Sequence, residues 1–143
     1  MSIALQQAKK SFKACEVPVG AVIIKNDKII SMGYNKSISN FDPTSHAEIN
    51  AIREAGKKIK NYRLTGLSIY VTLEPCTMCF GAIIHSRIEN IFFGAYDHRT
   101  GVCASCTNLN DLKCFNHTPK IMGGILEKEC SNILKDFFKS RRS

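Results

Sequence analysis

Two short stretches decide the fold, His46-Ala47-Glu48 and Pro75-Cys76-Thr77-Met78-Cys79. Capping residues precede the first and a proline opens the second, so each is predicted to lie at the start of a helix. Cys76 and Cys79 are three residues apart, which places both sulfurs on one helix face. Two thiolates and an imidazole are zinc ligands, and three of them leave one tetrahedral position open for water, as in catalytic zinc sites. The pattern therefore predicts one zinc ion bound by His46, Cys76 and Cys79.

Glu48 is the predicted proton shuttle. Bound zinc brings the pKa of its water toward neutrality. A carboxylate two residues after His46 can point at that water and move its proton, which is general acid–base work. Another interpretation stays open, because Ser45-x-x-Glu48 is also a capping box, in which Glu48 would only close the helix end. Each cysteine alone could likewise be a small buried residue.

Outward from these stretches, hydrophobic periodicity predicts an α/β chain. Predicted helices cover 2–15, 46–58, 75–86 and a C-terminal segment with an apolar stripe of Leu126, Cys130, Ile133, Leu134, Phe137 and Phe138. Predicted strands cover 17–24, 28–34, 67–73, 90–94 and 120–122, with a short helix at 109–112 inside the long loop 95–119. A hairpin followed by alternating strands and helices favours a five-stranded mixed sheet with helices on both faces, a three-layer α/β/α fold.

Composition narrows the class of protein. A chain of 143 residues fits one domain, 1–143. Its 20 Lys and Arg against 12 Asp and Glu give a net charge of +8, which favours phosphate-rich partners, although such an excess can also serve solubility alone. The seven cysteines are an odd number, so metal binding or burial is favoured over disulfides. We see neither a membrane-spanning stretch nor a signal peptide, and we expect a cytoplasmic protein without a membrane partner.

The sequence resembles the bacterial tRNA-specific adenosine deaminases, within the cytidine/deoxycytidylate deaminase superfamily. The H-x-E and P-C-x-x-C motifs mark zinc-dependent nucleobase deaminases in general. The resemblance runs from the first helix almost to the C-terminus, and its matching segments are 16–22, 46–49, 61–64, 73–79, 81–88 and 93–95. It implies a cytidine-deaminase-like fold, one Zn²⁺ per chain, and a homodimeric hydrolase that converts the wobble adenosine of an arginine tRNA anticodon to inosine.

The resemblance also implies roles for single residues. His46, Cys76 and Cys79 would bind zinc, and Glu48 would be the catalytic proton shuttle. Two further substrate-binding residues match the family pattern, Asn35 for the target adenine and Asp97 for the anticodon-loop backbone near the flipped base. Asn is also a frequent turn residue, and Asp97 could simply cap its loop. The target base must leave its stack to reach the metal, and an anticodon loop is already partly unstacked.

The C-terminal helix ends in basic residues that are candidates for contacts with tRNA phosphates. They are Lys139, Arg141 and Arg142. A solvated helix end favoured by the helix dipole is the alternative. A chain of this size is also expected to need a partner subunit to close the RNA site, and the family's dimer interface involves the zinc-bearing helices.

The long loop departs from the family pattern. Tyr96 stands where an arginine is common, and three cysteines stand where small or polar residues are usual. Cys103-x-x-Cys106 followed by Cys114-x-x-His117 could form a second, closed zinc site. The alternative is that these cysteines are small buried residues.

Two other functions remain open at this point. A deaminase of a free base or nucleoside, such as guanine or cytosine, would have the same fold and zinc. The charge of +8 and the tRNA-type segments argue against it. An RNA-binding module with a structural zinc is the other alternative, and Glu48 argues against it because a structural site has no use for that carboxylate.

Overall fold

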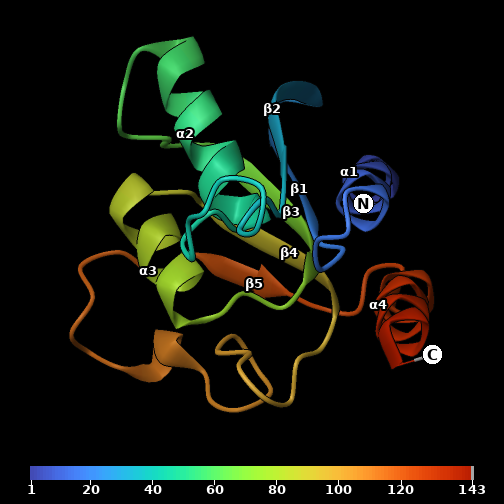
Figure 1. The fold of residues 1–143 in the computed structure, drawn as a ribbon. Coiled ribbons are helices and arrows are strands. Elements are labelled where there is room, and N and C mark those ends of the chain that lie inside the picture. Colours follow the sequence, from blue (N-terminus) through green and yellow to red (C-terminus); the bar gives the residue numbers. More distant parts are fainter. Residues whose placement is uncertain (143) are drawn as a thin grey trace.

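Five strands form one mixed sheet in the computed structural model, which describes residues 1–142 (Figure 1). The strands are β1 (Gly20–Lys25), β2 (Lys28–Tyr34), β3 (Ser68–Leu73), β4 (Asn90–Ala95) and β5 (Lys120–Met122). Their order in the sheet is β2-β1-β3-β4-β5. β1 pairs antiparallel with β2 and β3, whereas β3 pairs parallel with β4 and β4 with β5. The predicted mixed sheet and α/β class are confirmed.

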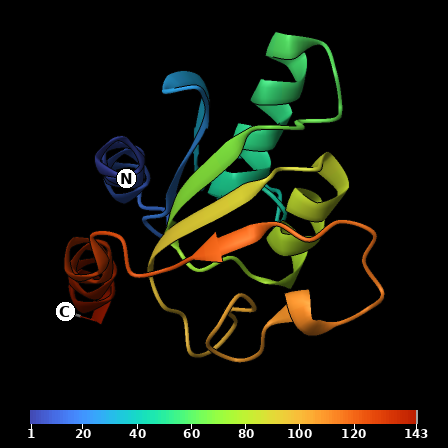
Figure 2. The same cartoon turned by 180° about the vertical axis from the view of Figure 1, so that it is seen from behind.

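Helices cover both faces of the sheet. α1 (Ser2–Lys13) and α4 (Glu127–Arg142) lie on one face, and α2 (Ala47–Ile59) and α3 (Thr77–Ser86) lie on the other, as Figures 1 and 2 both show. A parallel sheet region needs this double cover because its strands are apolar on both sides. Ile69 and Val71 of β3 share one buried face of the sheet with Ile91 and Phe93 of β4, and on the other face Gly94 lies against Cys130 of α4. The result is a three-layer α/β/α arrangement.

The face that carries α2 and α3 is the one that builds the site. Gly33 in β2 lets the start of α2 approach the sheet closely, because a Cβ at this position would strike the carbonyl oxygen of Ala47. Phe80 and Ile83 of α3 are fully buried in the core beside α2. The starts of α2 and α3 are therefore held side by side.

Most element boundaries differ from the predictions by one to three residues, and three of the differences are informative. The first strand begins at Gly20 rather than at Val17, since Pro18 has no N–H for the ladder. The third helix begins at Thr77, with Cys76 as its N-cap, rather than at Pro75. The short helix of the long loop is a 3₁₀ turn, η1 (Leu109–Asp111).

The C-terminal helix buries less of its predicted stripe than the periodicity implied. Cys130 and Phe137 are buried, whereas Phe138 is 46% exposed. Leu126 lies before the helix, with a φ of 50°. No helix among residues 1–142 has the length and apolar character needed to span a membrane.

Candidate metal centre and active site

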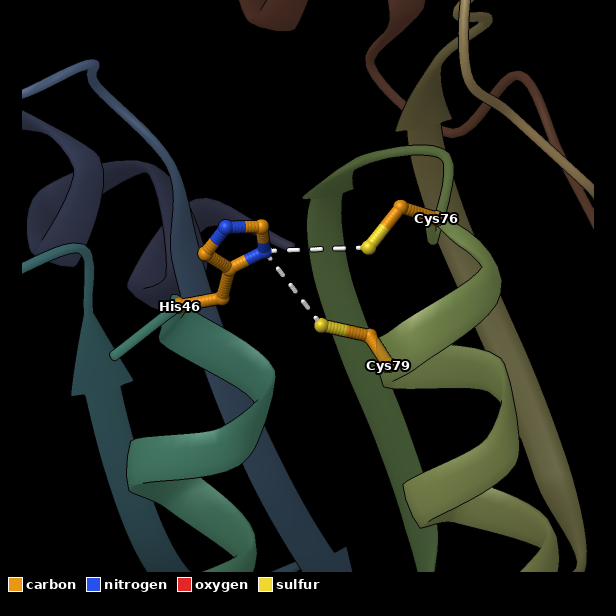
Figure 3. Close-up of side chains that lie close together, drawn as sticks. All are labelled: His46, Cys76 and Cys79. Carbon is orange, nitrogen blue, oxygen red and sulfur yellow. Dashed lines mark hydrogen bonds between the residues drawn. The ribbon is translucent and has the colours of Figure 1, made fainter. Parts of the chain in front are cut away.

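The three predicted ligands come from the starts of two helices (Figure 3). His46 is the N-cap residue of α2 and Cys76 is the N-cap residue of α3. Both have an extended backbone, with φ and ψ of −76° and 158° for His46 and of −80° and 174° for Cys76. Cys79 lies in the first turn of α3 and is buried. The positive ends of two helix dipoles therefore meet at these side chains, and such ends favour thiolates.

The geometry of the three side chains fits a tetrahedral metal ion. His46 Nδ1 lies 3.7 Å from Cys76 Sγ and 3.5 Å from Cys79 Sγ. Zinc bonds of ordinary length at a tetrahedral angle separate a nitrogen and a sulfur ligand by about 3.6 Å. Among residues 1–142, this is the only group of three or more His, Cys, Asp or Glu whose ligand atoms lie within 4.8 Å of one another. His46, Cys76 and Cys79 could thus hold one zinc ion.

The two thiols respond differently to their surroundings. The hydrogen bond from Cys79, together with the nearby His46, lowers the pKa of Cys76 to about 4. That same hydrogen bond, with burial, raises the pKa of Cys79. The contact with Cys76 raises the pKa of His46. The two sulfurs lie within 4.8 Å of each other, so two thiolates here would repel each other unless a cation lay between them. A divalent metal is such a cation.

Glu48 lies in the first turn of α2 and is only 4% exposed. Burial raises its pKa to about 7, against the lowering effect of a hydrogen bond from its own backbone N–H. The capping-box interpretation is wrong, because α2 has no side-chain capping bond and Ser45 Oγ donates instead to Asn50 Oδ1 at 3.1 Å. The Glu48 side chain lines a pocket together with His46 and Cys76.

That pocket has a volume of about 240 Å³. Sites for drug-sized ligands span roughly 300–1,000 Å³, so this pocket suits one planar base with the rest of a larger substrate outside. Its wall includes both substrate-binding residues predicted by resemblance, Asn35 and Asp97. The structure thus brings all six predicted site residues to one place.

Asn35 connects the pocket wall to a ligand-bearing helix. Its Oδ1 accepts a hydrogen bond from the Ala47 N–H at 2.8 Å, and its Nδ2 donates to the Val17 carbonyl at 3.0 Å. The residue follows β2 directly and lies outside the turn of the β1–β2 hairpin. Its amide is therefore fixed in orientation beside His46.

Asp97 uses its carboxylate within its own loop. Oδ1 accepts hydrogen bonds from the N–H groups of Arg99 (3.0 Å) and Thr100 (3.2 Å), and Oδ2 accepts one from the Thr100 hydroxyl at 2.8 Å. These are the hydrogen bonds expected if Asp97 caps its own loop, the alternative that the sequence left open. Asp97 and Thr100 nevertheless both line the pocket, so the cap shapes one of its walls.

Two buried carboxylates of the pocket were given no role by the sequence analysis. Glu16 accepts hydrogen bonds from the N–H groups of Ile38 (3.0 Å) and Ser39 (2.7 Å) and from the Ser39 hydroxyl (2.6 Å). Glu74 does the same for the loop after β4. The sequence signal that could have revealed these residues is a glutamate within an apolar stretch, as in Leu73-Glu74-Pro75 at the end of a buried strand. A charged residue is rarely fully buried without partners.

The second group of cysteines does not form a metal site in residues 1–142. Cys103 is buried, and burial raises its pKa to about 12. Cys106 Sγ donates to the His98 carbonyl at 3.0 Å, and His117 Nε2 lies 2.7 Å from the Ile88 carbonyl. The hypothesis of a second zinc finds no support in this arrangement.

A groove of about 610 Å³ adjoins the zinc pocket and shares Asp97 and Thr100 with it. Two partly exposed aromatic rings, Tyr96 and Phe138, lie in its wall. Its cationic lining residues are Arg99, Lys135 and Arg142. Of the three basic residues proposed for phosphates, Arg142 lines this groove, while Arg141 donates to the Cys15 carbonyl at 3.1 Å and lies over the Phe137 ring. Lys139 is exposed.

This fold and this donor set define a class of protein. Residues 1–95 match the family model of the cytidine and deoxycytidylate deaminase zinc-binding region. The chain belongs to this zinc-dependent deaminase family.

Curated relatives narrow the class to the tRNA-specific adenosine deaminases. The chain is 49% identical to the tRNA-specific adenosine deaminase of Haemophilus influenzae over 143 residues, which are 99% of this chain and 83% of that protein. It is 41% identical to that of Bacillus subtilis over 142 residues, 99% of this chain and 88% of that protein. The predicted family is thereby confirmed, and with it zinc as the cofactor.

Solved structures agree with the sequence relatives. A structure from work on A-to-I editing by tRNA:A34 deaminases at the wobble position superposes with a TM-score of 0.91 at 37% identity, over 94% of this chain and 97% of that one. A guanine deaminase from Nitrosomonas europaea superposes with a TM-score of 0.81 over 95% of this chain and 81% of that one, but at 21% identity. The second likeness shows a shared fold only.

Proposed function

We propose that this protein hydrolyses the wobble adenosine in the anticodon of a tRNA, an arginine tRNA by the resemblance above, to inosine and ammonia. Residues 1–143 would act as one zinc-dependent deaminase domain. The observation that carries the proposal is the meeting of His46, Cys76 and Cys79 with a buried Glu48 in one small pocket. The identity of 49% to a tRNA-specific adenosine deaminase over nearly the whole chain supports the substrate.

The chemistry divides between the metal and the chain. Zinc held by His46, Cys76 and Cys79 would lower the pKa of a bound water molecule toward neutrality. Glu48 is the proton carrier, because its buried carboxyl, with a pKa raised to about 7, can both accept and return a proton near neutrality. It takes one proton at its carboxylate as water adds to C6 of the adenine and delivers that proton to the ring nitrogen N1. It then takes the proton of the new C6 hydroxyl and delivers it to the amine, which leaves as ammonia while the C6–N bond breaks and the C6 carbonyl forms. Asn35 orients the base with the amide hydrogen that is not used by Val17.

An RNA substrate is supported by the surface around the pocket. The pocket has room for a flipped base alone, and the adjoining groove offers aromatic rings and cations to the rest of the strand. Aromatic side chains stack on unpaired bases and cations hold their phosphates. A free base would need neither feature. In this proposal Asp97 contacts the strand close to the flipped base.

Two parts of the proposal concern the assembly and its surroundings. The protein is proposed to form a homodimer through α2 and α3. On the outer side of α3, a Cβ added at Gly81 would meet no atom within 4 Å, so the face is open to a partner.

The proposed compartment is the cytoplasm. It is reducing, and all seven cysteines are unpaired.

The experiment compares substrates on one preparation. Zinc-loaded protein is incubated with an arginine tRNA anticodon stem-loop that carries adenosine at the wobble position, and with free adenosine, guanine and cytosine. We expect inosine in the stem-loop alone, and a loss of about 10²–10⁴-fold in rate for Glu48→Gln with zinc retained. Ammonia from free guanine or cytosine, without inosine in the stem-loop, would replace the tRNA substrate by a free base.

The dimer is tested separately by light scattering of wild type and of Gly81→Arg, whose side chain would obstruct the outer face of α3. We expect twice the chain mass for wild type and a shift toward the monomer for the variant. A matched Asn132→Arg variant places the same side chain at an exposed position of α4, on the other face of the sheet, and should dimerise as wild type does. If wild type is a monomer, or if Gly81→Arg dimerises as wild type does, the proposed interface is wrong.

A further inference from the structure

Glu74 stands between the last residue of β3 and the metal ligand Cys76. The loop after β4 is attached to this segment on both sides. The Glu74 N–H donates to the Ala95 carbonyl at 2.9 Å, and the Val102 N–H donates to the Pro75 carbonyl at 3.0 Å. The backbone that leads into Cys76 is therefore bonded to both ends of the segment 95–102.

The Glu74 side chain adds a denser set of bonds to the same loop. Its carboxylate accepts hydrogen bonds from the N–H groups of Asp97 (3.1 Å), Cys103 (3.0 Å), Ala104 (2.9 Å) and Ser105 (2.9 Å), and from the Ser105 hydroxyl. Glu74 is 2% exposed. Three consecutive N–H groups directed at one carboxylate form a nest for an anion, and here the anion is a side chain of the protein itself.

Close packing holds the loop on the carboxylate. A Cβ at Gly101 would strike both the carboxyl group of Glu74 and the carbonyl oxygen of Asp97. The backbone at 101 thus lies directly against Glu74, with no room for a side chain between them. The Glu74 carboxylate and the loop backbone at Gly101 are therefore fixed relative to each other.

The residues placed in this way are those that face the substrate pocket. Oε1 of Glu74 fixes the Asp97 backbone, and the Asp97 carboxylate in turn holds the N–H and hydroxyl of Thr100. Asp97 and Thr100 both line the pocket. A continuous chain of hydrogen bonds therefore runs from the segment that bears Cys76 to the part of the pocket wall formed by Asp97 and Thr100.

We propose that Glu74 is a positioning residue of the deamination, which acts through Asp97. By bonding the loop 95–105 to the segment that carries Cys76, it fixes the distance between the metal centre and the pocket wall that receives the RNA strand. Glu74 lines the same pocket, but both of its carboxylate oxygens accept hydrogen bonds from the loop, so its role is to position the loop. The inference rests on the proposed tRNA adenosine deaminase function.

Glu16 offers a matched control. It too is a buried carboxylate that accepts N–H and hydroxyl hydrogen bonds from a loop of the pocket. Its loop partners are Ile38 and Ser39, and no bond connects it to Asp97. A variant at Glu16 therefore removes a similar buried charge without disturbing the connection to Asp97.

The experiment is a double-variant cycle with KM, kcat and zinc per chain as readouts. Glu74→Gln, Asp97→Ala and their combination are measured on the stem-loop, beside Glu16→Gln alone and with Asp97→Ala. We expect Glu74→Gln to raise KM by about tenfold with kcat much less affected and with one zinc retained. In the Asp97→Ala background the same change should raise KM by less than about twofold, while the effect of Glu16→Gln should multiply with that of Asp97→Ala.

The possible outcomes separate the inference from the function on which it rests. If wild type forms no inosine in the stem-loop, the proposed function is wrong. If wild type is active but Glu74→Gln leaves KM unchanged, or multiplies fully with Asp97→Ala, the positioning role is wrong. If Glu74→Gln fails to fold or to keep zinc, Ser105→Ala removes only one donor to the carboxylate and decides the question in the same cycle, with a smaller expected rise in KM.

Discussion

The chain carries two C-x-x-C pairs, Cys76/Cys79 and Cys103/Cys106, and within residues 1–142 only the first belongs to a cluster of metal ligands. The first pair stands at the start of a helix that packs beside a second helix start, which brings in His46. The second pair lies in the loop after β4 and belongs to no such group of ligands among residues 1–142. Spacing alone therefore does not make a metal site; the third ligand must come from an element that the core holds in place.

Cys76 and Cys103, one thiol from each pair, also differ in the charge that they carry. Hydrogen bonding to Cys79 lowers the pKa of Cys76 to about 4, whereas burial raises the pKa of Cys103 to about 12. A thiolate is the form that binds a metal. Cys103 stays a neutral core residue, as the alternative interpretation of the sequence allowed.

The largest expected effect is the difference in zinc content and activity between two variants, each of which lacks one cysteine of one pair. Cys79→Ala should release the zinc, and the rate of inosine formation should fall by more than the roughly 10–100-fold that loss of an outer-shell partner costs. Cys106→Ala should keep one zinc per chain and near-normal activity. Elemental analysis and single-turnover assays measure both quantities. Zinc lost from Cys106→Ala, or retained by Cys79→Ala, would break the contrast between the pairs.

A smaller effect concerns thiol reactivity. Alkylation of the native zinc-loaded protein with iodoacetamide at pH 8 should add three groups, on the exposed Cys15, Cys106 and Cys114. Cys103 should react only after unfolding, because it is buried and its pKa is raised to about 12. Peptide mass spectrometry locates the adducts. A native adduct on Cys103 would show that its thiol is far more accessible than the structure has it.

The smallest expected effect is on the free energy of unfolding, to which the buried and charged Glu16 carboxylate contributes. Hydrogen bonds from Ser39 and Ile38 lower the pKa of Glu16, although burial by itself raises it. A carboxyl with a depressed folded-state pKa stabilises the fold above its unfolded pKa of about 4.3 and loses this effect as pH falls through the folded value. Glu16→Gln should therefore lower the free energy of unfolding by about 1–2 kcal/mol at pH 7, and the gap to wild type should narrow below about pH 4.

Urea unfolding of both proteins between pH 7 and 3 measures that gap. A gap that stays constant down to pH 3 would mean that the Glu16 carboxylate contributes no charge-dependent stability. In that case Glu16 would resemble Cys103, as a buried group without a favoured ion.

The metal ligands were predictable because their signals are local. Helix starts, the spacing of Cys76 and Cys79, and the place of Glu48 after His46 can all be read within a few residues. The sheet and its helices followed from periodicity. The capping-box interpretation was wrong because the Ser45 hydroxyl donates to the Asn50 side chain. The predicted strand start at Val17 was wrong because Pro18 has no N–H to donate to the sheet.

The roles of Glu16 and Glu74 could not be read in this way. Each depends on N–H groups more than twenty positions away in the chain, and a sequence contains no local mark of such bonds. The exposure of Phe138 has the same origin, because the periodicity of α4 does not say which elements cover it. What the sequence leaves open is the position of the loops around the pocket.

The parallel pair β3 and β4 has a further consequence. Both strands end at the same sheet edge, where the metal ligands and the loop after β4 begin. The reactive groups are built on helix starts, while the walls that choose a substrate are built on the segments 36–45 and 96–106. A library that randomises the exposed positions of these two segments, and spares Gly101, Glu74 and the ligands, would search for new base or strand preferences on an unchanged catalyst.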